Sequence, residues 1–186
     1  MSILTVYDDR TAEALEVHKD YDAVAKTLRG VGVDFERWQA DQHLDDNASN
    51  DEIIAAYRGS VDHLMHEYGF KSVDVVAMRP DHPDKDALRA KFLDEHTHSD
   101  FEVRFFVDGR GLFYIHSGGK VYAMLCERND LISVPANTTH WFDMGTQPRF
   151  KAIRLFTTPE GWVAQFTGSD VAKRFPTFDQ FVARYA

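Results

Sequence analysis

Two histidines and a glutamate lie close together in the stretch Glu95–Glu102, and a third histidine, His140, follows them. His96 and His98 alternate at the period of a β-strand, so both imidazole rings can project from one face. Glu102 keeps that parity if the chain stays extended, and His140 would come from a partner strand. Three imidazoles and one carboxylate suit iron, nickel, manganese or copper. An octahedral metal would keep two open positions, which predicts a reactive site.

A simpler interpretation of the same histidines is that each lies in a half-buried strand and is satisfied by local hydrogen bonds. That interpretation suits a lone histidine. The spacing HxHxxxE, with a further histidine downstream in a strand-rich segment, favours the metal site instead.

Length and composition are those of an ordinary globular protein. The chain has 186 residues, of which 44% are hydrophobic, so we expect a single domain over residues 1–186 with a sizeable core. Acidic residues outnumber basic ones by 30 to 21, and the net charge of -9 should repel phosphate backbones and anionic membrane surfaces. We therefore expect neither nucleic acid nor a membrane as a partner.

Other features of the sequence predict a cytoplasmic protein. No apolar stretch approaches the ~20 residues of a membrane span, and the N-terminus lacks the basic start and long apolar core of a signal peptide. The single cysteine, Cys126, cannot form an internal disulfide, which fits a reducing compartment. Nothing marks a self-complementary apolar face, so we expect a monomer.

Three zones of the chain differ in the period of their hydrophobic pattern. Up to about residue 92 helices and strands mix, including a helix that a capping box at Ser49–Glu52 opens and Gly69 ends. From about residue 96 to 157 strands alternate with turns, which we expect at Asp108–Gly111 and Ser117–Lys120. A short helix follows near Phe178–Tyr185. This pattern predicts a mainly β fold with flanking helices, in which a small barrel gathers inward side chains into a pocket.

The histidine-rich stretch resembles the first motif of the cupin family. Residues His96–Gly109 carry the ligand spacing of that motif and the glycine after it. The run Pro135-x-Asn137-x-x-His140 resembles the second motif, with Asn129 and Asn137 where the family has glycines. Asn137 still tolerates left-handed backbone geometry, and these departures leave all four ligands in place. The resemblance implies a cupin-type jelly-roll barrel, on which the mixed N-terminal part (about 1–92) would pack.

A narrower family matches more of the chain, because six stretches look like acireductone dioxygenases. These are Phe35–Asp41, Phe92–His98, Glu102–Phe106, Asn129–Pro135, His140–Gly145 and Pro159–Gly168. The resemblance covers nearly the whole sequence and is more specific than the HxH pattern. It implies a role in methionine salvage, in which the enediol 1,2-dihydroxy-3-keto-5-methylthiopentene is cleaved with dioxygen.

The resemblance also implies a cofactor, products and partners. One Fe(II) or Ni(II) ion per chain would be held by His96, His98, Glu102 and His140. With iron the products would be formate and 4-methylthio-2-oxobutanoate; with nickel they would be carbon monoxide, formate and 3-methylthiopropanoate. The partners would be the small-molecule acireductone and dioxygen.

By the same resemblance, three charged residues would serve the reaction. Arg104 would match the substrate-facing arginine of the family, Arg154 would add a second cation, and Glu95 would lie just behind the first metal ligand. Strand parity points Arg104 the same way as Glu102, where its charge would favour an ionised substrate. A structural ion pair inside the barrel is the alternative role of Arg104.

Aromatic side chains could wall a dry pocket around the methylthio tail of the substrate. The candidates are Phe105, Phe142 and Trp162, for each of which plain core packing is the alternative. Phe142 shares the parity of His140.

Two other functions keep the barrel but change its activity. A metal-dependent isomerase or epimerase would act on a sugar or keto acid and would not take up oxygen with an enediol. A binding module would sense a small ligand and use its metal only for stability, so that metal removal would unfold the chain without abolishing any turnover.

Overall fold

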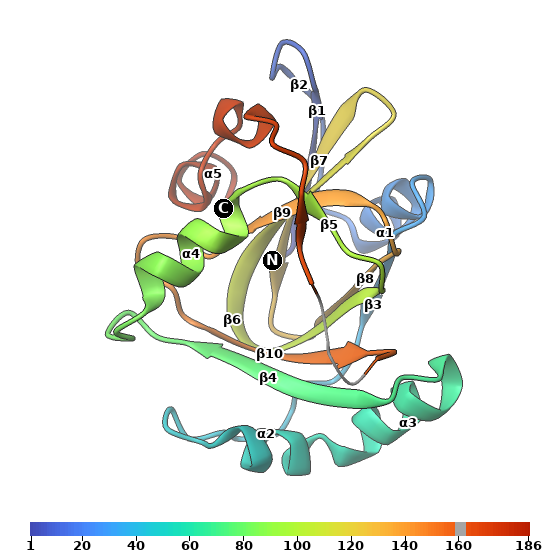
Figure 1. The fold of residues 1–186 in the computed structure, drawn as a ribbon, viewed down its shortest axis with the longest axis vertical. Helices are drawn as coiled ribbons and strands as arrows, with labels where there is room; N and C mark the ends of the chain where they lie inside the picture. The colour runs from blue at the N-terminus through green and yellow to red at the C-terminus, as the bar shows by residue number, and fades with distance from the viewer. Residues whose placement is uncertain (159–162) are drawn as a thin grey trace.

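The computed structural model describes residues 1–158 and 163–186, which form a β-barrel with helices on its outside (Figure 1). Among these residues, no helix is long and apolar enough to cross a membrane. The strands are β1 Ile3–Asp8, β2 Ala14–His18, β3 Asp34–Arg37, β4 Ser72–Met78, β5 His96–Thr97, β6 Glu102–Ser117, β7 Lys120–Glu127, β8 Asp130–Val134, β9 Thr139–Asp143, β10 Phe150–Phe156 and β11 Gln165–Phe166. The helices are α1 Tyr21–Arg29, α2 Asn50–Ala56, α3 Arg58–Tyr68, α4 Lys85–Leu93, α5 Phe178–Tyr185 and the 3-10 helix η1 Val171–Arg174. The expected mainly β fold with flanking helices is confirmed.

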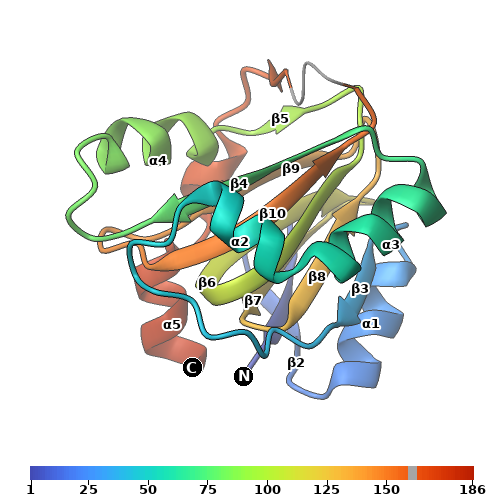
Figure 2. The same ribbon diagram turned by 90° about the horizontal axis from the view of Figure 1, so that it is seen from below.

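Strand β6 joins the two faces of the barrel. One face has the order β11-β5-β9-β6-β7-β1-β2, and the other is formed by β4, β10, β6, β8 and β3. The first half of β6 pairs with β8 and β10, whereas its second half lies between β7 and β9. Figure 2 shows β6 passing between these neighbours. A single long strand therefore carries side chains from one end of the barrel interior to the other.

The expected turn at Asp108–Gly111 is wrong, because β6 continues through it. The strand bends there instead: Gly109 has a φ of 67°, and the pairing with β10 shifts register between Lys151 and Ala152. A Cβ on Gly109 would lie 1.9 Å from the carbonyl oxygen of Arg149. Glycine is thus required at this position, where β10 passes close to the bend in β6. The residues that predicted a turn form a β-bulge instead.

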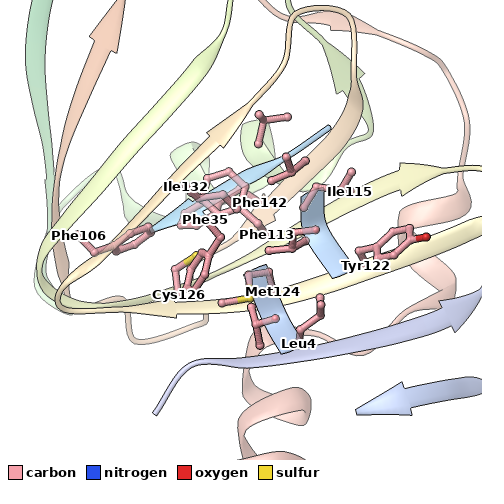
Figure 3. Close-up of a cluster of buried hydrophobic side chains, with 14 of the residues drawn as sticks. Leu4, Phe35, Phe106, Phe113, Ile115, Tyr122, Met124, Cys126, Ile132 and Phe142 are labelled. Carbon is pink, nitrogen blue, oxygen red and sulfur yellow. The ribbon is translucent and has the colours of Figure 1, made fainter. Parts of the chain in front are cut away.

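Alternation along the strands sorts the large side chains into an inner cluster and two outer ones. Phe106 and Phe113 of β6 point inward and pack with side chains from the other strands, as Figure 3 shows. Phe105 points outward into a second cluster under α2 and α3. Tyr114 points into a third, which α5 covers. The barrel interior around Phe106 and Phe113 is therefore apolar, and the helices cover the side chains that face outward.

The helix predicted from Ser49 to Gly69 is two helices. Its start is confirmed, because Ser49 and Glu52 form a reciprocal capping box, and so is its end at Gly69, which has a φ of 73°. The break falls at Tyr57, whose backbone leaves helical geometry. Its ring packs edge-on against Phe105, with 5.5 Å between centroids. Packing on the barrel thus interrupts a continuous helical pattern. That residues 1–186 form one domain stays a prediction.

Candidate metal centre

Short strands at one end of the barrel bring together the four residues whose spacing predicted a metal site. His96 of β5 lies directly opposite His140 of β9, and Glu102 begins β6. One ligand atom from each of these three residues and from His98 lies within 4.8 Å of the others, and all four side chains are buried. The structure therefore assembles a buried group of three histidines and one glutamate from distant parts of the chain.

Backbone carbonyl groups orient two of the imidazole rings. Nδ1 of His96 donates to the carbonyl oxygen of Asp94, and Nδ1 of His140 donates to that of Thr138, each at 2.7 Å. Because a carbonyl can only accept, each ring carries its proton on Nδ1 and leaves Nε2 for the centre of the group. Such a bond on the outer nitrogen is the usual support for a metal-ligating histidine.

The carboxylate of Glu102 is the point on which the imidazoles converge. Its Oε2 lies 2.9 Å from Nε2 of His98 and 3.0 Å from Nε2 of His140. Burial alone would raise the pKa of Glu102, but the charge of Arg104 and the close contacts with the rings of His140 and His98 lower that pKa well below its usual range. Burial also lowers the pKa of His96 to about 4. An ionised carboxylate and a neutral imidazole are the forms that bind metal, so the donor set fits a divalent ion.

The loop before β9 contains Asn137, which has a φ of 62°, the left-handed backbone geometry that asparagine tolerates. Asn129, in the turn between β7 and β8, also has a positive φ, of 84°. The N–H of Asn137 donates to the carbonyl oxygen of His98 at 2.7 Å. This bond ties the segment that carries His140 to the segment that carries the other two histidines.

Arg104 lies beside this group, at the next inward position of β6. Its Nη2 is 2.8 Å from Oε1 of Glu102, and its guanidinium lies over the ring of Phe142 at 4.5 Å from the centroid. Burial lowers the pKa of Arg104, and the carboxylate of Glu102 opposes that effect. Arg104 thus forms the structural ion pair that was the alternative to a role at the substrate. It also lines the cavity, so one side chain combines the ion pair with a position at the proposed substrate site.

Arg154 is directly opposite Arg104 in the pairing of β10 with β6. It makes a two-pronged ion pair with Asp74 of β4, with N–O distances of 2.8 and 2.6 Å. The side chain is less buried than Arg104 and also lines the cavity. The structure therefore places two arginines on neighbouring strands at the cavity, each next to a carboxylate.

A cavity of about 870 Å³ opens above the histidines. Its floor consists of the three histidines, Glu102 and Arg104, and its walls come mainly from β4 and α4. Apolar wall residues are Val75, Val76, Ala77, Met78, Leu88, Phe92, Phe142, Phe156, Val163, Ala164 and Phe166. The cavity thus combines a polar, charged floor with largely apolar walls, the usual character of a small-molecule site.

Two residues predicted for the site, Phe105 and Glu95, face away from the cavity, and a third, Trp162, falls outside the described residues. Phe105 is the neighbour of Arg104 on a strand, so it points to the opposite face, where it packs against Trp38 and Tyr57. Its assignment to the pocket wall is therefore corrected. Phe142 does line the cavity. Trp162 lies outside the described residues.

Glu95 is buried behind His96, but its carboxylate turns away from the cavity. Oε2 is 2.7 Å from Nδ1 of His116, and Oε1 accepts from the Thr167 hydroxyl at 2.8 Å. His116 in turn contacts Asp9. The expected catalytic role is corrected, because Glu95 binds strands together and does not reach the cavity that a substrate would fill.

Sequence reasoning missed the walls that β4 and α4 supply. Asp74 carried a usable signal, because a carboxylate inside the apolar run Val73–Met78 requires a partner. Leu88, Lys91 and Phe92 carried none, since only the packing of α4 beside β9 brings them to the cavity.

Comparison with known proteins connects this site to one family. The model of the ARD/ARD' family matches residues 3–164. Acireductone dioxygenases from Methylococcus capsulatus and Aquifex aeolicus are 58% and 56% identical to the chain, over 100% and 98% of it and 100% and 99% of their own lengths. The solved structure of an acireductone dioxygenase from Bacillus anthracis, described with a cadmium ion in its active centre, is 31% identical with a TM-score of 0.75, over 89% of this chain and 98% of that one. The chain therefore belongs to the acireductone dioxygenase family, whose members are metal-dependent dioxygenases on a cupin-type fold.

Proposed function

We propose that this chain cleaves the acireductone 1,2-dihydroxy-3-keto-5-methylthiopentene with dioxygen, as a step of methionine salvage. The observation that carries the proposal is the buried group of three histidines and one glutamate at the floor of a cavity that two arginines line. The names of the relatives, which match over their full lengths, support the substrate. Neither an isomerase nor a binding module has a comparable observation in its favour.

His96, His98, Glu102 and His140 would hold one Fe(II) or Ni(II) ion per chain. Their nitrogen and oxygen atoms suit both ions, so the metal supply would decide which is bound. When bound, the ion would supply Lewis-acid and redox chemistry to the enediol and to oxygen. The carbonyl groups of Asp94 and Thr138 would keep the outer nitrogens protonated, which fixes the rings in the ligating orientation.

Arg104 would hold the substrate in its ionised form. An acireductone is an acidic enediol, and a permanent cation beside its oxygens favours the anion over the neutral molecule. The guanidinium is buried among the faces of Phe92, Phe113 and Phe142, so water screens its charge little. The same charge would stabilise negative charge that develops during oxygen addition.

Arg154 and the apolar walls would orient the rest of the substrate. Arg154 is fixed by Asp74 of β4 and lines the cavity, where it would add a second positive charge near the enediol. Phe92, Phe142 and Met78 would contact the methylthio tail and exclude water from it. A largely apolar pocket that presents two fixed guanidinium groups would thus select an anionic head with an apolar tail.

The test is oxygen uptake with freshly generated acireductone by metal-free protein reloaded separately with Fe(II) and Ni(II). We expect uptake by both forms. The iron-loaded protein should yield formate and 4-methylthio-2-oxobutanoate, and the nickel-loaded protein should yield carbon monoxide, formate and 3-methylthiopropanoate. Absence of uptake in both fully loaded forms would refute the proposed substrate. Identical products from both forms would refute the dependence of the products on the metal.

The location and assembly of the chain are further proposals. We infer a cytoplasmic monomer from the composition and from the single, buried Cys126. Gel filtration would test the monomer, and fractionation of cells would test the location.

A further inference from the structure

Lys91 lies in the last turn of α4 (Lys85–Leu93), where the helix borders the cavity. Its side chain is exposed to solvent and also lines the cavity, together with Leu88 and Phe92 of the same helix. A residue that is both exposed and part of the lining stands at the mouth and not on the floor. Lys91 therefore lies where a ligand would pass from solvent toward the histidines.

A buried ion pair fixes the helix that presents Lys91. Nε and Nη2 of Arg89 donate to the two carboxylate oxygens of Asp143, at 2.7 and 3.0 Å. Asp143 is 1% exposed and also accepts the backbone N–H groups of Gly145 and Phe178. Since Asp143 ends β9, the strand that carries His140, α4 is tied to the floor of the cavity, and Figure 1 shows it beside that strand.

The charges around the cavity differ in whether a partner balances them. Arg104 has Glu102 beside it, and Arg154 has Asp74. Lys91 has no ion-pair partner within residues 1–158 and 163–186, although the chain as a whole carries a net charge of -9. An anion that approaches this protein thus meets a net negative charge overall and, at the mouth, a positive charge that forms no ion pair with any described residue.

We propose that Lys91 is a substrate-capture residue that draws the anionic enediolate into the cavity and contributes to the preference for an anionic head group. This inference rests on the proposed function, because it takes its ligand to be an ionised enediol. Lys91 acts on the approach and binding of the anion. It is too near solvent to take part in the bond-breaking step, so its effect belongs to kcat/KM and not to kcat.

The experiment compares Lys91→Gln with a matched variant from the same helix, Lys85→Gln. Lys85 donates to the carbonyl oxygen of Thr146 and is absent from the cavity lining, yet its loss changes the net charge equally. At low ionic strength we expect kcat/KM for Lys91→Gln to fall about three- to tenfold, with kcat within about twofold of the unaltered protein. The difference in kcat/KM between the unaltered protein and Lys91→Gln should shrink as salt is added. Salt screens the attraction between Lys91 and the anion, and the glutamine variant has no such attraction to lose. Lys91→Arg should retain the unaltered value.

Two outcomes would overturn the inference. One is a kcat/KM of Lys91→Gln equal to that of the unaltered protein at every ionic strength. The other is an equal loss in Lys85→Gln, which would assign the effect to overall charge and not to the mouth of the cavity.

A binding measurement separates this inference from the proposed function. Nickel-loaded protein is titrated calorimetrically with the anion 4-methylthio-2-oxobutanoate under exclusion of oxygen. We expect weaker binding to Lys91→Gln than to Lys85→Gln. If the unaltered protein failed to turn over acireductone but showed this difference, the proposed function alone would fall. Equal binding by the two variants would refute the capture role whatever the activity.

Discussion

The two ends of the barrel interior use the same strand for opposite purposes. On β6, the inward positions Glu102 and Arg104 lie at the cavity, whereas Phe106 and Phe113 lie in the apolar cluster at the other end. All four side chains are no more than 2% exposed. Burial alone therefore does not distinguish core from site. The difference lies in what stabilises each buried side chain: contact with apolar atoms for Phe106 and Phe113, and an opposite charge for Glu102 and Arg104.

Phe142 marks the boundary between these ends. Its ring packs against Phe113, with 4.9 Å between centroids, and its face lies under the guanidinium of Arg104. Gly111 leaves the room for it, since a Cβ there would be 2.3 Å from the ring. Core packing thus sets the position of the cation at the floor of the cavity, and changes at the two ends should have separable effects.

Glu102→Gln should produce the largest effect, at the cavity end. The substitution keeps the shape of the side chain but removes the negative charge that a divalent ion requires and leaves Arg104 buried without its partner. We expect bound metal well below one ion per chain and turnover reduced more than about a thousandfold, or ~4 kcal/mol. Metal content is measured by elemental analysis and turnover by oxygen uptake. Glu67→Gln, on the exposed surface of α3, is the control, and full metal content in Glu102→Gln would contradict the account.

Phe106→Ala should have its effect at the core end. The side chain is fully buried, and its removal leaves a cavity, so the free energy of unfolding should fall by about 3–5 kcal/mol. The folded variant should still bind one metal ion, because Phe106 lies beyond Arg104 on the strand. Chemical denaturation measures the loss, with the half-exposed Leu15→Ala as a control that should change it by no more than about 0.5 kcal/mol. Loss of metal in a folded Phe106→Ala would show that the two ends are not separable.

Arg104→Ala tests the cation between the two ends. We expect metal content to stay near one ion per chain while turnover falls about a hundredfold, or ~2.7 kcal/mol, because a charge that stabilises the ionised substrate is lost. Arg104→Lys should recover part of the turnover. Arg149→Ala, which removes an exposed arginine outside the cavity lining, should change neither quantity. Normal turnover in Arg104→Ala would leave this residue with a structural role only.

Asp130→Asn should have the smallest effect, far from the metal. Asp130 begins β8 and accepts from the Ser2 hydroxyl and the N–H of Glu127, but burial outweighs these bonds and raises its pKa to about 6. The folded protein therefore holds this proton more tightly than the unfolded chain does, and the carboxyl group lowers stability as the pH rises from about 4 to 6. Asparagine does not ionise, so Asp130→Asn should not lose stability in this way. The free energy of unfolding of the variant minus that of the unaltered protein should therefore increase by about 1–2 kcal/mol between about pH 4 and pH 6. A pH-independent difference between the two proteins would contradict the assignment.

Sequence patterns predicted the parts of this molecule that depend on neighbours along the chain. The capping box at Ser49, the helix near Phe178–Tyr185 and the hairpin at Ser117–Lys120 are present as expected. The ligand spacing from His96 to Glu102 was visible in the sequence, but β5 ends at Thr97 and β6 begins at Glu102, so the bend between the two strands, and not strand parity alone, brings Glu102 to the histidines. His140 was recognised through a motif, since nothing local says that β9 pairs with β5.

Features that depend on tertiary packing could not be predicted. Strand β1 was missed because it is almost entirely buried, so its sequence shows no alternation. The direction of Glu95 depends on His116 and Thr167, which are distant in sequence. The position of Phe105, in contrast, could have been predicted from the sequence. The strand parity that placed Arg104 inward also places its neighbour Phe105 outward, away from the cavity.

The metal centre is tested most directly by a titration of metal-free protein with Fe(II), in which bound metal and oxygen uptake with acireductone are measured on the same samples. We expect that both quantities rise together and reach a plateau at one ion per chain, and that neither rises in Glu102→Gln. Uptake that continues without bound metal, or one bound ion per chain without uptake, would show that the three histidines and Glu102 are not the centre at which the substrate is cleaved.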